Sequence, residues 1–136
     1  MKYLLDTNIC IYIITEKPKK VLRKFEHYPV SEFGISSITH AELQYGVAKS
    51  KNKDTNQNAL DEFLLPLTIL PFHGERLMKC YGEIRTSPES KGKTIGPLDM
   101  LIAAHALGLH LTIISNNIKE FSRIPKLKCE NWVSKA

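Results

Sequence analysis

The sequence predicts an α/β fold in which helices cover both faces of a central parallel sheet. Short apolar runs alternate along the chain with longer segments whose apolar residues recur at helical spacing. This alternation indicates parallel strands, because such strands need a crossover connection that is usually a helix. The chain has no internal repeat and no linker, and 136 residues fit one domain, so residues 1–136 are expected to form a single unit.

The strands are predicted from the apolar runs, with the last of them at an edge of the sheet. They span 2–5, 33–37, 68–70, 111–114 and 127–132. The helices are predicted from apolar spacing and from end signals such as Pro18 in a first turn and Gly108 at a C-terminus. They span 9–15, 18 to about 25, 40–49, 59–64, 74–86 and 97–107, with a short turn ending near 121.

Two polar segments separate the predicted helices. Residues 49–58 carry alternating lysines and are expected to be the most mobile part of the chain, and residues 87–94 are expected to be a loop. Apolar content is 43% and charged content 24%, which is ordinary for a globular protein. The net charge of +5 favours an anionic partner without proving one.

The composition also indicates a cellular setting. The three cysteines are widely spaced and form no metal-binding or disulfide pattern, so they are expected to be reduced thiols. The apolar N-terminal run is interrupted by Asp6 and Asn8 and has no cleavage signal after it. No stretch approaches the roughly 20 apolar residues of a membrane helix. We therefore expect a soluble cytoplasmic protein.

Three carboxylates, those of Asp6, Glu42 and Asp99, occupy similar positions along the chain. Each comes soon after a run of apolar residues, and each lies at or near the start of a predicted helix. The carboxyl ends of parallel strands meet at one edge of a sheet, where binding sites form. The three acids are therefore expected to lie together at that edge.

Each acid also has a structural explanation of its own. Thr39 and Glu42 match a capping box, in which each side chain bonds the other's backbone N–H. Asp99 lies in the first turn after Pro97, where a negative charge is favoured by about 0.3–1 kcal/mol. Asp6 is a good N-cap residue. Taken singly, each acid is explained by helix capping better than by function.

Together, the acids favour a divalent-metal site. Lys2 is the sole Lys or Arg within four residues of Asp6 or Glu42, so local ion pairs do not explain them. Acids that share one edge stay charged and close when a cation joins them. Asn117 is a candidate further ligand through its carbonyl oxygen, although it also suits a turn or an N-cap. On a basic protein, such a site most often cleaves phosphodiesters.

Other chemistries find no support in the sequence. The histidines form no ligand pattern, and the glycines match no phosphate-binding loop. No serine or cysteine lies on a recognisable nucleophile elbow.

Four motifs occur in a fixed order along the chain. They are Asp6-Thr7-Asn8, Glu42-Leu43 with Gly46, Gly96-x-x-Asp99 with Ala103-Ala104-His105, and Ser115-Asn116-Asn117 with Glu120-Phe121. In this order and at these distances they resemble the motifs of the PIN-domain ribonucleases, and within them the VapC toxins of bacterial toxin–antitoxin pairs. The resemblance extends from Met1 to Trp132.

The resemblance implies an α/β/α sandwich and a Mg²⁺-dependent endoribonuclease that also accepts Mn²⁺. Asp6, Glu42 and Asp99 correspond to the family's metal-holding acids, and with Asn117 they are the expected catalytic residues. The family often has a further acid at the position of Asn117, so this chain departs from the pattern of a second metal site. Family members are typically homodimers inhibited by a small VapB-type antitoxin whose tail enters the active-site groove. Several cut RNA, including tRNA in the anticodon loop.

The expected reaction is hydrolysis of an RNA phosphodiester by a water bound to the metal. Glu42 or Asp99 would orient that water or accept its proton. Two other functions stay open: an RNA-processing PIN nuclease without an antitoxin, and a non-catalytic nucleic-acid-binding module whose acids are only helix caps. A phosphatase with Asp6 as nucleophile is disfavoured, because position 8 is Asn where a second Asp is expected.

Overall fold

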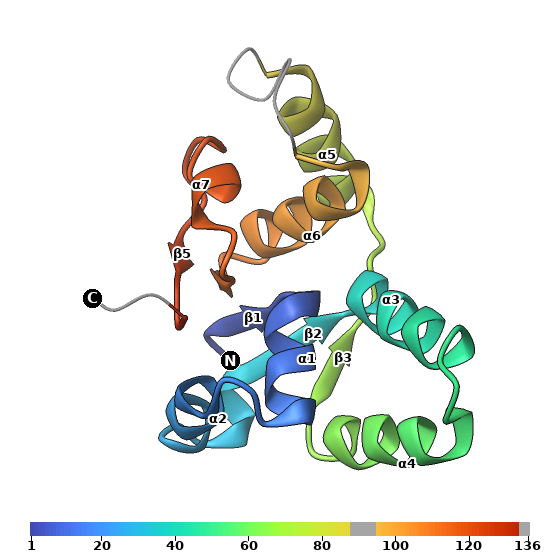
Figure 1. The fold of residues 1–136 in the computed structure, drawn as a ribbon. Helices are drawn as coiled ribbons and strands as arrows, with labels where there is room; N and C mark the ends of the chain where they lie inside the picture. The colour runs from blue at the N-terminus through green and yellow to red at the C-terminus, as the bar shows by residue number, and fades with distance from the viewer. Residues whose placement is uncertain (88–94, 134–136) are drawn as a thin grey trace.

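A computed structural model describes residues 1–87 and 95–133 (Figure 1). Within them, five strands form one sheet in the order β3-β2-β1-β4-β5, and every neighbouring pair is parallel. The strands are β1 (Tyr3–Leu5), β2 (Phe33–Ser36), β3 (Thr68–Leu70), β4 (Thr112–Ile114) and β5 (Cys129–Glu130). The predicted parallel sheet is confirmed, and each predicted strand is present.

Helices surround this sheet on both faces (Figure 1). They are α1 (Thr7–Thr15), α2 (Lys19–Glu26), α3 (Ser37–Ala48), α4 (Lys53–Leu64), α5 (Glu75–Thr86), α6 (Pro97–Gly108), α7 (Ile118–Phe121) and a 3₁₀ turn, η1 (Val30–Glu32). None of the helices in the described parts of the chain is long and apolar enough to cross a membrane.

The central strand β1 divides the core into two layers. Tyr3 and Leu5 point into the cluster that holds residues of α1, α2 and α4, whereas Leu4 points into the cluster that holds residues of α5, α6 and α7. Successive residues of a strand face opposite sides of the sheet, so a fully apolar strand is expected where both sides are covered. All three residues of β1 are buried, which confirms the predicted α/β/α architecture.

The segment expected to be most mobile is partly helical. α4 begins at Lys53, so the second half of the polar stretch 49–58 belongs to this helix, and the predicted helix start at residue 59 was wrong. Gln57 provides a physical reason, because its Nε2 donates hydrogen bonds to Gln44 on α3 at 3.2 Å and to Asp61 at 2.9 Å. The loop predicted at 87–94 lies outside the described residues except for Ser87.

Gly108 does not occupy the predicted position beyond the end of a helix. It is the last residue of α6, and the left-handed conformation occurs two residues later, at His110. Its missing side chain matters for packing instead, because a Cβ at this position would overlap Leu77 Cδ2 of α5. The Gly108 carbonyl also accepts a hydrogen bond from Arg76 Nε at 2.7 Å. Gly108 therefore brings α5 and α6 into close contact.

We predict that Gly108→Ala lowers the free energy of unfolding by about 1–3 kcal/mol, because the buried Leu77 must move to admit a methyl group. Gly82→Ala is the matched control on α5. A Cβ at that position meets no atom within 4 Å, so the substitution is expected to raise stability by about 0.5–1 kcal/mol. Urea denaturation measures both changes, and equal effects would contradict the close approach of α5 and α6.

Candidate active site

The acids converge on the carboxyl ends of β1 and β4. Within the sheet, β2 and β3 lie on one side of β1, and β4 and β5 lie on its other side. The strand order therefore reverses between β1 and β4. Such a reversal point is where α/β sheets bind ligands. The Asp6 N–H donates to the Ile114 carbonyl at 3.0 Å, which joins the ends of the two strands.

Asp6 is deeply buried, with 4% of its surface exposed. It is the N-cap of α1, and its Oδ1 accepts a hydrogen bond from the Ile9 N–H at 2.9 Å. The Ser115 hydroxyl, just after β4, donates a second hydrogen bond to the carboxylate. Burial, together with the charges of Asp99 and Glu42, raises the pKa of Asp6 to about 6 against the effect of these two bonds.

Glu42 does not belong to a capping box, and that structural explanation of it was wrong. Ser36 is the N-cap of α3, with its Oγ accepting from the Ile38 N–H at 3.1 Å, so Thr39 lies buried inside the helix. Glu42 then lies in the second turn, beyond the N–H groups that a cap can reach. Its Oε1 accepts a hydrogen bond from Thr7 Oγ1 at 2.8 Å, which directs the carboxylate toward the start of α1.

Asp99 lies in the first turn of α6, as predicted, and is partly buried. Burial is the largest cause that raises the pKa of Asp99, followed by the charge of Glu42 and then by that of Glu120. The charge of Glu42 raises the pKa of both Asp6 and Asp99, and the charge of Asp99 also raises the pKa of Asp6. The structure therefore gathers the three acids at one edge of the sheet.

Asn117 and Glu120 approach the same region from α7. Asn117 is the N-cap residue of this helix, and its N–H donates to Ser115 Oγ at 2.8 Å. Glu120 lies one turn later, and its charge is the second acidic cause, after that of Glu42, that raises the pKa of Asp99. The sequence indicated Asn117 as the candidate further ligand, whereas Ser115 and Glu120 appeared only as members of the fourth motif and had no assigned role at the site. The role of Glu120 has no local sequence signal, because its approach to Asp99 depends on how α7 packs.

The chemistry of these side chains fits a divalent cation. Within residues 1–87 and 95–133, none of Asp6, Glu42 and Asp99 forms an ion pair with Lys or Arg. Neither do any three His, Cys, Asp or Glu side chains of these residues lie close enough to enclose a metal ion by themselves. Carboxylates that repel one another at a partly open site match Mg²⁺, which is usually held by one or two carboxylates and keeps several waters.

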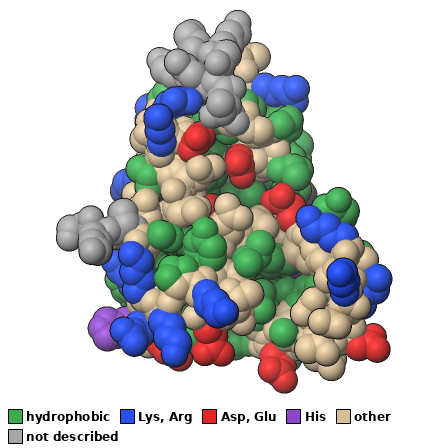
Figure 2. Space-filling view, in the orientation of Figure 1, with side chains coloured by type: hydrophobic (Ala, Val, Ile, Leu, Met, Phe, Trp, Pro, Cys, Tyr) green, Lys and Arg blue, Asp and Glu red, His purple; other side chains and the backbone are tan. Residues whose placement is uncertain are grey.

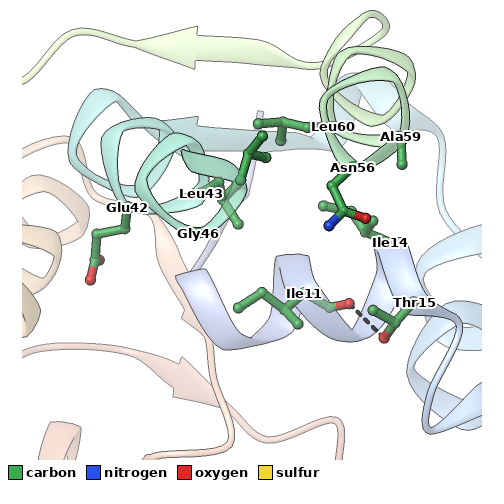
Figure 3. Close-up of a pocket in the computed structure, with 10 residues that line it drawn as sticks. Ile11, Ile14, Thr15, Glu42, Leu43, Gly46, Asn56, Ala59 and Leu60 are labelled. Atoms are coloured by element: carbon green, nitrogen blue, oxygen red, sulfur yellow. Dashed lines mark hydrogen bonds between the residues drawn. The ribbon is translucent and has the colours of Figure 1, made fainter. Parts of the chain in front are cut away.

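An apolar cavity of about 270 Å³ adjoins Glu42 between α1, α3 and α4 (Figure 3). Glu42 lies at one end of the lining residues, and Ile11, Ile14, Leu43 and Leu60 line the remainder. In the space-filling view, acidic side chains are exposed in the upper middle of this face and along its lower edge, and Lys and Arg lie mostly toward its sides (Figure 2). Glu42 therefore borders a groove with mostly apolar walls.

The architecture and the acids define a class of protein. The model of the PIN domain matches residues 3–127. The chain is 50% identical to ribonuclease VapC2 of Rickettsia felis, covering 97% of this chain and 98% of that protein. It is 37% identical to the tRNA(fMet)-specific endonuclease VapC of Salmonella typhimurium, covering 97% of this chain and 98% of that protein.

Two crystal structures share the fold closely. VapBC2 from Rickettsia felis, bound to a DNA fragment from its promoter, has a TM-score of 0.86 and 48% identity and covers 97% of this chain and 99% of that chain. DNA-bound VapBC from Salmonella typhimurium has a TM-score of 0.88 and 37% identity, with 97% and 98% covered. The chain belongs to the PIN-domain family and, within it, to the VapC ribonucleases.

We predict that Asp6→Asn stabilises the metal-free protein at neutral pH. The pKa of Asp6 is raised to about 6 in the folded chain from an ordinary value of 3.8, so folding disfavours its ionised form. Below about pH 4 the carboxyl is protonated and does not lower the free energy of unfolding. As the pH rises through 6, its ionisation lowers the free energy of unfolding by up to roughly 3 kcal/mol. The Asn side chain is neutral at every pH and still accepts from Ile9.

Urea denaturation of both proteins from pH 4 to 8 tests this prediction. The variant's advantage should be absent near pH 4 and complete above about pH 7. Glu62→Gln, at an exposed position on α4, is the control and should show no such trend. A stability difference that does not change with pH would contradict the burial of a charged Asp6.

Proposed function

We propose that the chain is a Mg²⁺-dependent endoribonuclease that acts as the toxin of a VapBC-type pair, with tRNA as its substrate. The observation that supports this most strongly is the meeting of Asp6, Glu42 and Asp99 at the carboxyl edge of the sheet, with raised pKa values for both aspartates. Helix capping alone does not explain the three acids, because Glu42 has no capping role in the structure.

Each candidate residue has a proposed role. Asp6 and Asp99 hold the cation, for which Mn²⁺ is a substitute, and Asn117 contributes its carbonyl oxygen directly or through a water. A divalent ion held there would lower the pKa of a bound water and neutralise charge on the scissile phosphate. Glu42 orients the attacking water or accepts its proton, and the Thr7 hydroxyl fixes the direction of its carboxylate.

The proposed substrate is tRNA, cut in the anticodon loop. The relative from Salmonella typhimurium that supports this is named a tRNA(fMet)-specific endonuclease. A net charge of +5 suits a polyanionic substrate. The whole chain acts as a single cytoplasmic nuclease domain in this proposal.

The proposed protein partners are a VapB-type antitoxin and a second copy of this chain. The crystal structures of VapBC2 from Rickettsia felis and of VapBC from Salmonella typhimurium support the antitoxin. The apolar groove is a suitable place for its inhibitory segment, because Ile11 on the groove wall is 42% exposed and Glu42 lies at the groove's end. A cationic side chain of that segment would then reach the acids.

Cleavage of purified tRNA and of total RNA tests the nuclease. Asp6→Asn and Asp99→Asn are expected to lower the cleavage rate by at least about 100-fold, or ~2.7 kcal/mol of transition-state stabilisation, and EDTA should abolish cleavage. Glu42→Gln should give a comparable loss. It is a clean test because Glu42 does not cap α3, so the fold has no need of its carboxylate for that purpose.

Circular dichroism confirms that each variant is folded, and Glu62→Gln serves as a charge-matched control. Sequencing of the product ends locates the cut. Undiminished cleavage by Asp6→Asn or Asp99→Asn would contradict the site, and cuts spread over unrelated RNAs would contradict the tRNA proposal.

Filling the groove tests the antitoxin proposal. Gly46 lies on α3 one turn after Glu42, and a Cβ there meets no atom within 4 Å, so Gly46→Phe fills the groove without disturbing the core. We expect about 10-fold or weaker inhibition by the antitoxin encoded next to this chain. The same change at Gly82, on the distant α5, should leave inhibition intact. Equal inhibition of both variants would contradict docking in this groove.

A further inference from the structure

His105 and Ser36 form a buried polar pair between two helices that carry the acids. His105 lies on α6, six residues after Asp99, and Ser36 is the N-cap of α3, six residues before Glu42. His105 Nδ1 and Ser36 Oγ are 2.8 Å apart. Both residues are 0% exposed, so the pair lies fully within the protein interior.

His105 lies in a fully buried stretch of α6. Ala104 and Ala106 beside it are 0% exposed, and the Phe72 ring meets the imidazole edge-on with ring centres 5.4 Å apart. In the described part of the chain, His105 Nε2 has no hydrogen-bond partner. Burying such an atom is unfavourable, and an apolar ring of similar size would fill this space without that cost. Packing alone therefore does not explain a histidine here.

The imidazole is neutral near physiological pH. Burial, followed by the charge of His73, lowers the pKa of His105 to about 4. The pair is thus a hydrogen bond between two neutral groups, and it brings no charge to the acids. Ser36 Oγ bonds both the Ile38 N–H of α3 and the His105 ring of α6, so a single oxygen connects the start of α3 to the last turn of α6.

The position of this hydrogen bond affects where Glu42 and Asp99 lie, because a change in helix tilt at the bond would move both residues. Six residues of helix span ~9 Å, so Glu42 and Asp99 each lie at the end of an arm of about that length. A tilt of about 10° at the bond would displace an acid by about 1.5 Å. A misplacement of about 1 Å in an active site can lower a rate by roughly 100-fold.

We propose that the hydrogen bond between His105 and Ser36 is a positioning link, which holds α3 against α6 so that Glu42 and Asp99 are close enough to act on one cation. His105 acts through the helices and does not touch the substrate. The inference rests on the proposed function, since it concerns the same site.

Three single variants test the link. His105→Phe keeps a ring of similar size and removes the hydrogen bond, whereas His105→Asn places an amide near the former Nδ1 and retains it. Ser37→Ala is the matched control, because it removes the neighbouring hydroxyl, which accepts from the Phe72 N–H at 2.9 Å and makes no bond to α6. The readouts are kcat and KM for RNA cleavage, Mn²⁺ affinity by calorimetry, and the thermal midpoint.

For His105→Phe, we expect kcat to fall by about 10- to 100-fold, KM to stay within about twofold, and Mn²⁺ affinity to weaken by about 10-fold. The thermal midpoint should not fall, since an unpartnered buried nitrogen is removed. His105→Asn should recover most of kcat and of the Mn²⁺ affinity, and Ser37→Ala should leave both unchanged.

Ser36→Gly keeps the link testable if His105→Phe does not fold. Glycine is nearly as good an N-cap as serine, so this variant removes the hydroxyl with little loss of helix stability, and the same falls in kcat and Mn²⁺ affinity are expected. Folded His105→Phe or Ser36→Gly with wild-type kcat and Mn²⁺ affinity would overturn the link. Failure of the wild-type protein to cut RNA would instead overturn the proposed function.

Discussion

The burial of the Asp6 carboxylate at the end of β1 is the constraint on which the rest of the site depends. β1 is the central strand, paired with β2 on one side and β4 on the other, so the backbone at Asp6 has little freedom to move. The two hydrogen bonds to the carboxylate come from Ile9 and Ser115, and neither supplies a full positive charge. Folding therefore places an incompletely compensated acid in the interior, next to two further acids, and a bound cation would offset that cost.

The surrounding helices are arranged to keep the acids in this relation. Thr7, in the first turn of α1, bonds Glu42 of α3, and the Ser36–His105 pair joins α3 to α6. On the far side of α6, Gly108 allows α5 to approach closely. Contacts well outside the acid cluster thus determine how close its carboxylates lie to one another. A site made of a few side chains therefore depends on the packing of helices on both faces of the sheet.

The sequence was sufficient for features with a local signal. Continuous apolar runs such as 3–5 predict strands buried on both faces, and Pro97 marks the start of α6 at its observed residue. Asp6 and Asp99 were found because they follow such elements directly. The start of α3 was missed by a few residues. Thr39 and Ser36 are both good caps by residue type, and the contacts that Ser36 makes with Leu70 of β3 and with His105 of α6 are tertiary contacts that the local sequence does not indicate. Glu120 was missed because its approach to Asp99 depends on how α7 packs, which its own sequence does not indicate.

The most direct test of a cation site among mutually repelling acids is the number of protons released when Mg²⁺ binds, measured by calorimetry in buffers with different ionisation enthalpies. Because the pKa of Asp6 is about 6 and that of Asp99 is also raised, binding at pH 6 must displace protons from the site. We expect release of at least about half a proton per ion at pH 6, falling toward zero at pH 8, and a clearly smaller release in Asp6→Asn, in which Asp99 is the remaining aspartate with a raised pKa. Binding without proton release at pH 6, or undiminished release in Asp6→Asn, would contradict the proposal that the buried Asp6 holds the metal.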